Sequence, residues 1–361
     1  GDFPRSGIML VSLLHPRVAD DLRRWFVPRA RECGGMPRWS LASDETGVMV
    51  GDPGALIVAN AHAFGARFDA AAALAIATRP AARCNRWVVR PSELLADALG
   101  YVPEEPPLWG SAALTLEYAV ADAALSELAR ALGDGALAAA LAAKASRWKN
   151  LFDPSTGFIR PRHRDGAWKT PFTPTHQRGF VEGNAAQYTF FVPHDPEGLA
   201  RALGGTAATF ARLDALFEKL NVGIRQPHFY IGNEPQFATP FLYARLGAVE
   251  RTAAVVARIR DRAFTGLPSG LPGNDDLGAL SSWYVWAALG LYPDLPGKAD
   301  LALAAPLFPR ARVRLRDGST LTITRGPGAG ITLDGSPVTG GSLPLSRLSG
   351  GDRVLAFPER Q

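Results

Sequence analysis

Apolar residues recur at helical spacing over most of this 361-residue chain. From about residue 10 to residue 300, apolar stretches of helical length alternate with loops that contain Gly, Pro, Asn and Asp. The predicted helices span residues 16–32, 53–64, 70–77, 108–132, 136–152, 197–203, 207–220, 240–246, 250–263 and 281–289. Helical hairpins in this number can close into a toroid with an inner and an outer ring, with functional residues on the loops.

The pattern changes after Lys298. Four short runs, at residues 312–316, 320–324, 331–333 and 354–357, are separated by Gly-containing turns, which is typical of strands joined by tight connections. We therefore expect a mainly α protein with a helical domain over residues 1–298. Residues 299–361 are expected to form a small β-strand segment, which packs on that domain or pairs with a further sheet.

Composition excludes several classes of protein. Hydrophobic residues make up 47% and charged residues 20%, as in an ordinary globular protein. The net charge of +5 comes from arginines scattered among acidic residues, and no nucleic-acid-binding motif accompanies it. No apolar run approaches the roughly 20 residues of a membrane span. We therefore expect neither a nucleic-acid partner nor a membrane span.

The two cysteines, Cys33 and Cys84, lie far apart and lack metal-type spacing. This excludes a disulfide framework, and we do not expect the two to form a single bridge. The sequence opens at Gly1 without a methionine, which leaves room for a lost targeting segment.

Glu182 is the first candidate for chemistry. Aromatic residues surround it in the sequence, at Phe180, Tyr188 and Phe190. A carboxyl group in partly desolvated aromatic surroundings has a raised pKa, which suits a general acid. The alternative is a helix N-terminal glutamate that binds backbone donors.

Asp275 and Asp276 form the second candidate group. They lie between Gly273 and Gly278, directly before the helix predicted from residue 281. The helix dipole and free N–H groups there keep a carboxylate ionised, as a general base requires. The alternative is a plain N-terminal cap.

Three further residues carry hard oxygen atoms of the kind that calcium prefers, namely Gln187, Asn233 and Glu234. His228 lacks the spacing of a zinc ligand, so we expect it to be structural or to hydrogen-bond a substrate. Trp283 belongs to an aromatic stripe on a predicted helix. Core packing explains most such stripes, and stacking on a sugar ring is the functional alternative.

Taken together, these segments resemble glycoside hydrolase family 92, the calcium-dependent exo-acting α-mannosidases. The family motif Glu-Gly-Asn-Ala-Trp-Gln-Tyr-Thr corresponds to residues 182–189, and Val-Pro-His-Asp to residues 192–195. The Gly-Asn-Glu-Pro motif is present at residues 232–235. The motif Gly-Leu-Pro-Gly-Asn-Glu-Asp, which continues to Trp-Tyr, corresponds to residues 270–284. The matches follow the family's order over nearly the whole chain.

The resemblance implies an (α/α)6 toroid preceded by a β-sandwich domain, with the active site between the two. It implies that Glu182 is the general acid and Asp276 the base, assisted by Asp275, in a reaction that inverts the anomeric centre. Calcium, held partly by the segment with Asn233 and Glu234, would bridge vicinal hydroxyls of mannose.

Two residues at the start of the chain, Asp2 and Arg5, resemble the family's Trp-Asp-x-x-Arg segment, which helps to hold mannose. Asn274, in the motif of the base, is likewise expected to bind substrate. The chain departs from the family pattern at Ala186, where tryptophan is common, and at Asp275, where glutamate is usual.

We therefore predict an inverting exo-α-mannosidase that hydrolyses terminal α-mannosides of glycans with calcium. The β-sandwich domain is expected to be missing or separate, and the resemblance favours a secreted or periplasmic location. One alternative is a toroidal glycosidase with another sugar specificity. The other is a truncated or inactive relative that only binds sugar or a partner chain.

Overall fold

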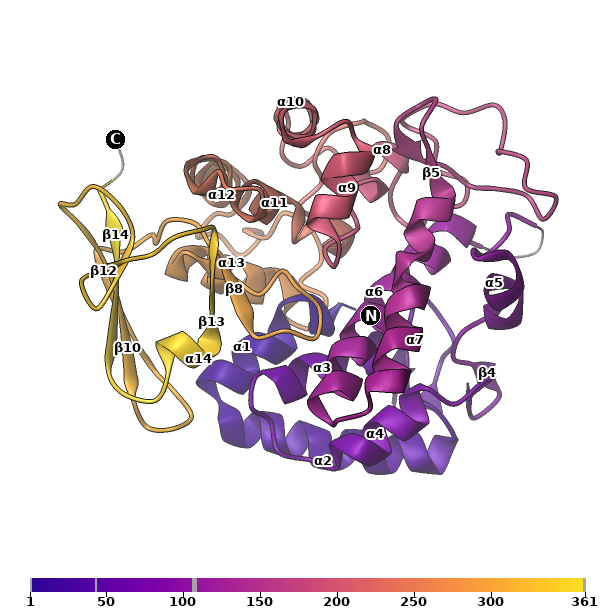
Figure 1. The fold of residues 1–361 in the computed structure, drawn as a ribbon, viewed down its shortest axis with the longest axis horizontal. Helices are drawn as coiled ribbons and strands as arrows, with labels where there is room; N and C mark the ends of the chain where they lie inside the picture. Colours follow the sequence, from indigo (N-terminus) through magenta and orange to yellow (C-terminus); the bar gives the residue numbers. More distant parts are fainter. Residues whose placement is uncertain (1, 43, 106–108, 360–361) are drawn as a thin grey trace.

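The computed structural model describes residues 2–42, 44–105 and 109–359, and within them the chain is mainly helical with small sheets (Figure 1). The helices up to residue 290 are η1 (Phe3–Arg5), α1 (Gly7–Leu14), α2 (Pro16–Cys33), α3 (Pro53–Ala63), α4 (Ala70–Ala77), α5 (Glu93–Leu99), α6 (Ser111–Ala131), α7 (Gly135–Ala145), η2 (Ser146–Leu151), α8 (Ala185–Tyr188), α9 (Pro196–Ala202), α10 (Thr206–Leu216), η3 (Glu234–Gln236), η4 (Thr239–Phe241), α11 (Leu242–Arg245), α12 (Val249–Ala263) and α13 (Ala279–Leu289).

All ten predicted helices are present, and all but one of them have shifted ends. The stretch predicted over residues 136–152 divides into α7 and the tighter helix η2. Residue 108, the predicted start of α6, lies outside the described residues. Helix α1 was not predicted, although Ile8, Met9 and Leu13 are buried in the core. In the described part of the chain, no helix combines the length and apolarity that crossing a membrane would require.

Short strand pairs occur among the helices. They are β1 (Ser40–Leu41) with β2 (Asp44–Glu45), β3 (Arg83–Cys84) with β4 (Trp87–Val88), and β5 (Phe152–Asp153) with β6 (Phe158–Ile159). Each is an antiparallel pair of two-residue strands, too short to show the alternation that identifies a strand in a sequence.

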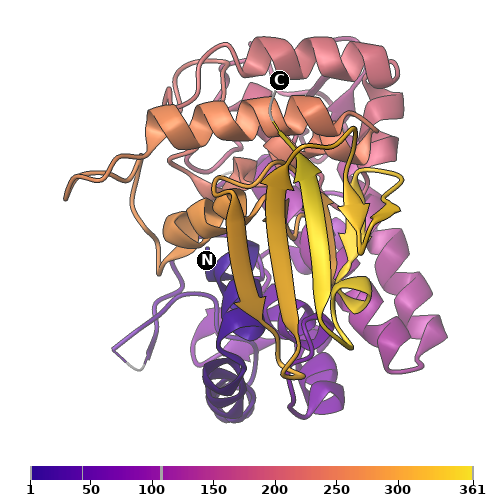
Figure 2. The same cartoon turned by 90° about the vertical axis from the view of Figure 1, so that its left-hand side faces the viewer.

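The C-terminal segment forms a five-stranded sheet in the order β12-β11-β14-β10-β9, which covers one side of the helices (Figure 2). Its strands are β9 (Arg310–Arg314), β10 (Thr320–Gly326), β11 (Thr332–Leu333), β12 (Ser336–Pro337) and β14 (Arg353–Pro358), and the short helix α14 (Leu345–Leu348) precedes β14. Strands β10 and β14 are parallel, and the other pairs are antiparallel. Alternate residues such as Val313, Leu321 and Ile323 are buried, while Arg312 is exposed, as expected for a half-buried sheet.

A second sheet joins the two parts of the chain. Strand β8 (Asp300–Leu303) pairs with β7 (Leu291–Tyr292), which directly follows α13, and with β13 (Ser342–Pro344). Arg316 also forms an ion pair with Asp20 of α2 at 2.9 Å. The strands after residue 298 therefore share hydrogen bonds and one hydrophobic core with the helical part.

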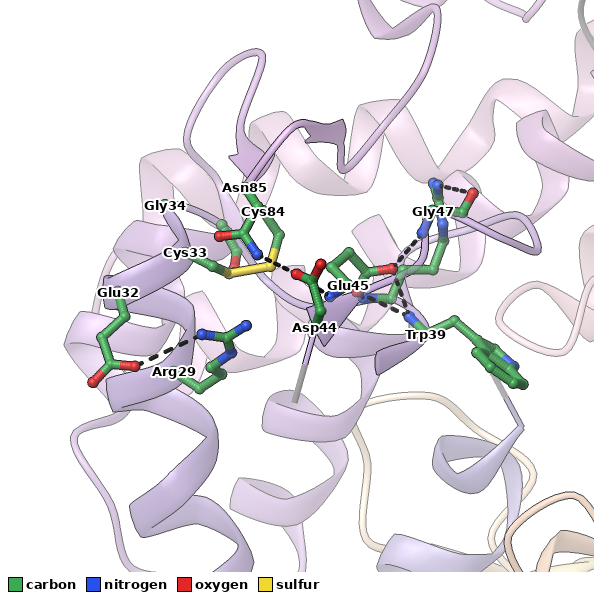
Figure 3. The surroundings of a disulfide bond; sticks show 12 residues. Arg29, Glu32, Cys33, Gly34, Trp39, Asp44, Glu45, Gly47, Cys84 and Asn85 are labelled. Carbon is green, nitrogen blue, oxygen red and sulfur yellow. Dashed lines mark hydrogen bonds and ion pairs between the residues drawn. A yellow bond between two sulfur atoms is a disulfide. The ribbon is translucent and has the colours of Figure 1, made fainter. Parts of the chain in front are cut away.

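Cys33 and Cys84 form a disulfide (Figure 3), so the expectation that they do not pair is wrong. Cys33 ends α2, and Gly34 reverses the chain with a φ of 95°, in the left-handed region that glycine adopts readily. The Asn85 N–H donates to the Cys33 carbonyl at 2.8 Å, which holds β3 beside the end of the helix. The two cysteines are 51 residues apart in the sequence, so their proximity in the fold could not be predicted from spacing. Such bridges are typical of oxidising compartments.

Candidate active site

Glu182 lies in the loop before α8, two residues ahead of its N-cap. Asn184 caps α8 and forms a capping box with Gln187, so the helix N-terminal role belongs to Asn184. The Tyr188 hydroxyl donates to the Val181 carbonyl at 2.6 Å, which fixes the loop. Glu182 itself has a φ of +50°, an uncommon conformation for a residue other than glycine. Such strain is frequent at functional sites.

The two aspartates before α13 have different surroundings. The Asp275 carboxylate accepts a hydrogen bond from the Ser281 N–H at 2.9 Å, so Asp275 satisfies a backbone donor at the start of the helix. Asp276 has a φ of +48°, and its neighbour Leu277 has a φ of +56°. The chain therefore turns sharply at Asp276, whose carboxylate meets that of Glu234.

Asp2, Glu234 and Asp276 form a cluster that we call the carboxylate triad. One oxygen atom of each lies within 4.8 Å of the others, although η1, η3 and the loop before α13 are far apart in the sequence. Burial, a hydrogen bond with Asp276 and the charge of Asp2 raise the pKa of Glu234 to about 9, against the opposing effect of Arg5. The charge of Asp2 and the hydrogen bond with Asp276 thus both disfavour ionisation of Glu234.

Arg5 lies beside the triad and forms an ion pair with Glu117 of α6. Its Nη2 atom is 2.6 Å from Oε1 of Glu117, and both side chains are nearly buried. The guanidinium also lies 4.9 Å from the centre of the Phe191 ring. Glu117 was not predicted to have a role in the site, although a carboxylate inside the apolar stretch of α6 is a signal that could have marked it.

Helix η1 is held in place by side chains from two further elements. Nδ2 of Asn60 in α3 donates to the Pro4 carbonyl at 2.8 Å. The hydroxyl of Tyr292 in β7 donates to the Arg5 carbonyl at 2.9 Å. These contacts fix the backbone that presents Asp2 to the triad.

Helix α13 connects the segments that carry the triad. Asp276 lies just before this helix, and Nε1 of Trp283 donates to the Phe237 carbonyl at 3.0 Å, beside η3. Nε1 of Trp286 donates to the Ser6 carbonyl at 3.1 Å, beside η1. Trp283 is fully buried and stacks on Phe264, so of the two expectations core packing holds, and its assignment to substrate binding is wrong.

The backbones of the two loops that carry Glu234 and Asp276 touch each other. A Cβ added to Gly273 would lie 2.3 Å from the carbonyl oxygen of Gly232. This approach requires the absence of a side chain at Gly273, and it sets the separation of the two carboxylates.

A small pocket adjoins these groups. Its lining includes Asp2, Arg5, Glu117, Glu182, Asn233 and Glu234. Part of the Glu182 side chain is exposed, yet burial and then the charges of Asp2 and Asp276 raise its pKa. Asp276 is not among the lining residues, but its charge reaches Glu182.

The structure brings some predicted site residues together and not others. Nδ2 of Asn233 donates to the Glu182 carbonyl at 2.8 Å, which joins the two loops. The Gln187 amide donates to two backbone carbonyls and accepts the Asn184 N–H, so it has a structural role that the metal assignment did not anticipate. The His228 ring contacts the Ala215 carbonyl, and Asn274 is exposed. Neither lines the pocket.

Comparison with known proteins gives a consistent picture. The model of the "Glycosyl hydrolase family 92 catalytic domain" matches residues 2–356. An "uncharacterized secreted glycosidase" of the fungus Arthroderma benhamiae is 31% identical over 195 residues, which are 47% of this chain and 24% of the relative.

Solved structures are similar over 99% of this chain. One is the family GH92 inverting mannosidase of Bacteroides thetaiotaomicron, with 29% identity, a TM-score of 0.87 and 53% of its length covered. Another α-mannosidase of family GH92 from the same bacterium shares 26% identity, with a TM-score of 0.89 and 48% covered. Its complex with mannoimidazole has a TM-score of 0.90 at 25% identity, with 50% covered. This chain thus spans about half the length of these enzymes.

Proposed function

Since the chain belongs to glycosyl hydrolase family 92, we propose that it is the catalytic domain of an inverting exo-α-mannosidase that removes terminal α-mannosides from glycans. The observation that carries this proposal is the position of Glu182, partly withdrawn from water and within reach of the charge of Asp276. We also propose that the helices close into an (α/α)6 toroid, as the similarity to the solved mannosidases suggests.

The environments of the two carboxyl groups favour different roles. Glu182 has a raised pKa, so it keeps a proton to higher pH and can donate it to the leaving oxygen. The Asp276 carboxylate lies beside that of Glu234, and its lone pairs can take a proton from an attacking water. For inversion, the two carboxyl groups are expected about 6.5–9.5 Å apart, with room for that water.

A calcium ion fits the carboxylate triad chemically. Carboxylate oxygens are hard donors, and the Asn233 side chain beside them carries an amide oxygen of the same kind. The nearby guanidinium of Arg5 is paired with Glu117, and a divalent cation would reduce the repulsion among the three carboxylates. We propose Asp2, Glu234, Asp276 and Asn233 as the residues that hold it. When bound, calcium would bind vicinal hydroxyls of mannose.

Two further properties are proposed from similarity and from the disulfide. A location outside the cytoplasm agrees with the bridge between Cys33 and Cys84 and with the secreted relative. The longer relatives have room for a further domain. We therefore propose that a β-sandwich domain, on the same or a separate chain, completes the pocket.

Hydrolysis of aryl α-mannoside and aryl α-glucoside, each with and without a chelator, tests the proposal. We expect chelator-sensitive release from the mannoside alone, with β-mannose as the first product detected by NMR. Preference for the glucoside would favour a glycosidase of other specificity. Mannose binding without turnover would favour a non-catalytic relative.

A further inference from the structure

We propose that Glu117 is a positioning residue that holds Arg5 away from the carboxylate triad and so keeps the triad available to a divalent cation. The inference rests on the proposed cation site. It assigns a role to a buried ion pair that takes no part in the acid–base chemistry.

Arg5 has three carboxylates within electrostatic reach and hydrogen-bonds Glu117. Burial alone would lower the pKa of Arg5, but the charges of Glu117, Asp2 and Glu234, in that order, raise it. Its Nη2 atom lies 2.6 Å from Oε1 of Glu117. Arg5 thus lines the same pocket as its partner Glu117 and as two members of the triad, Asp2 and Glu234.

Glu117 is held rigidly. It lies on α6, one of the most completely buried helices, and its side chain is 5% exposed. A Cβ placed on Gly51, which has a φ of +92°, would lie 3.0 Å from Oε2 of Glu117, so the loop before α3 covers the carboxylate. The Phe191 ring lies against the guanidinium. The ion pair therefore has a fixed geometry.

Removal of the charge of Glu117 has a specific consequence. A buried guanidinium without a partner is costly, so Arg5 would turn to the other carboxylates whose charges act on it, those of Asp2 and Glu234. It would then compete with the cation for the same oxygens. With Glu117 present, Arg5 is already neutralised and does not compete.

Calcium binding, followed by isothermal titration calorimetry at neutral pH, tests the inference without any measurement of activity. The proteins are the wild type, Glu117→Gln, Arg5→Met and the double variant, each checked for native circular dichroism. We expect Glu117→Gln to weaken calcium binding at least tenfold, since the isosteric amide leaves Arg5 uncompensated. The double variant should regain affinity to within threefold of Arg5→Met, because the competitor is absent.

Arg5→Met alone keeps the inference falsifiable if Glu117→Gln does not fold. Its affinity should equal that of the wild type within threefold, because Glu117 already neutralises Arg5. A tenfold gain would overturn the inference. Unchanged binding by Glu117→Gln, or no recovery in the double variant, would also overturn it. An absence of binding by the wild type would overturn the calcium site, and this inference with it.

Discussion

The backbone strain at Glu182 predicts that removal of this side chain stabilises the fold. A left-handed conformation costs most L-residues about 1–2 kcal/mol, whereas asparagine tolerates it well. Glu182→Asn should therefore be more stable than Glu182→Gln by about 1 kcal/mol, since glutamine keeps the backbone cost. For 361 residues the unfolding entropy is about 0.8 kcal/mol/K, so this difference corresponds to about 1–2 °C in Tm.

The electrostatic part of the effect depends on pH. Burial and the charges of Asp2 and Asp276 raise the pKa of Glu182 above 4.5 in the folded state, so wild-type stability falls as pH rises through that range. Glu182→Gln lacks this loss. Its advantage over the wild type should appear above about pH 4.5 and vanish in acid, while the advantage of asparagine over glutamine should not change with pH.

Urea unfolding at pH 4 and pH 7 checks both parts. Glu218 provides a matched control, because it is exposed and its φ is not positive. There, the asparagine variant should have no advantage over the glutamine variant. Equal stability of the two Glu182 variants, or a gain of the same size at Glu218, would refute the reasoning. Under the proposed function, both Glu182 variants also lose hydrolysis of unactivated mannosides, which would show that stability is gained at the expense of activity.

Further predictions concern activity and the disulfide. Glu182→Gln should abolish hydrolysis of unactivated mannosides but spare substrates with good leaving groups, whereas Asp276→Asn should abolish both; equal losses on both substrates in the Glu182 variant would contradict an acid role. The rate should fall on the alkaline side of its pH profile with a midpoint above 4.5, as Glu182 loses its proton, and this limb should be absent for the activated substrate. Gly273→Ala should lower activity at least tenfold, because its Cβ would lie 2.3 Å from the Gly232 carbonyl oxygen, while an alanine at Gly133, which has open space around it, should not. Reduction of the disulfide, which closes a loop of about 51 residues, should lower the free energy of unfolding by about 4 kcal/mol. Denaturation with and without reductant measures this difference. A loss below about 1 kcal/mol would show that other contacts constrain the loop.

The helices were predictable because apolar spacing and caps are local. Helix α4 (Ala70–Ala77) has the predicted bounds, and α2 differs from its prediction by one residue. The strand pairs were not predictable from residue patterns, because two-residue strands such as β3 carry no alternation. The disulfide was not predicted either, since it depends on the turn at Gly34 and not on the spacing of the cysteines.

In the candidate site, too, local motifs were predictable from the sequence, whereas contacts between distant residues were not. Motifs made Glu182 and Asp276 candidates, because the residue types and their flanking glycines are visible in the sequence, and in the structure the charge of Asp276 acts on Glu182. The part played by Glu117 depends on a contact between residues 5 and 117, which no local pattern reveals. Trp283 was misassigned because an aromatic stripe looks the same whether it faces the core or a ligand.

The indole contacts of α13 have a consequence for local motion. Because Trp283 and Trp286 bond to the backbones of Phe237 and Ser6, we expect the three triad segments to unfold as one cooperative unit with the protein interior. In hydrogen exchange, amides of α1 next to Ser6 should open together with those of α13, at rates set by subglobal unfolding rather than by loop fluctuation. Thermal inactivation should then coincide with the loss of buried tryptophan fluorescence, without an earlier phase in which only the site is disordered.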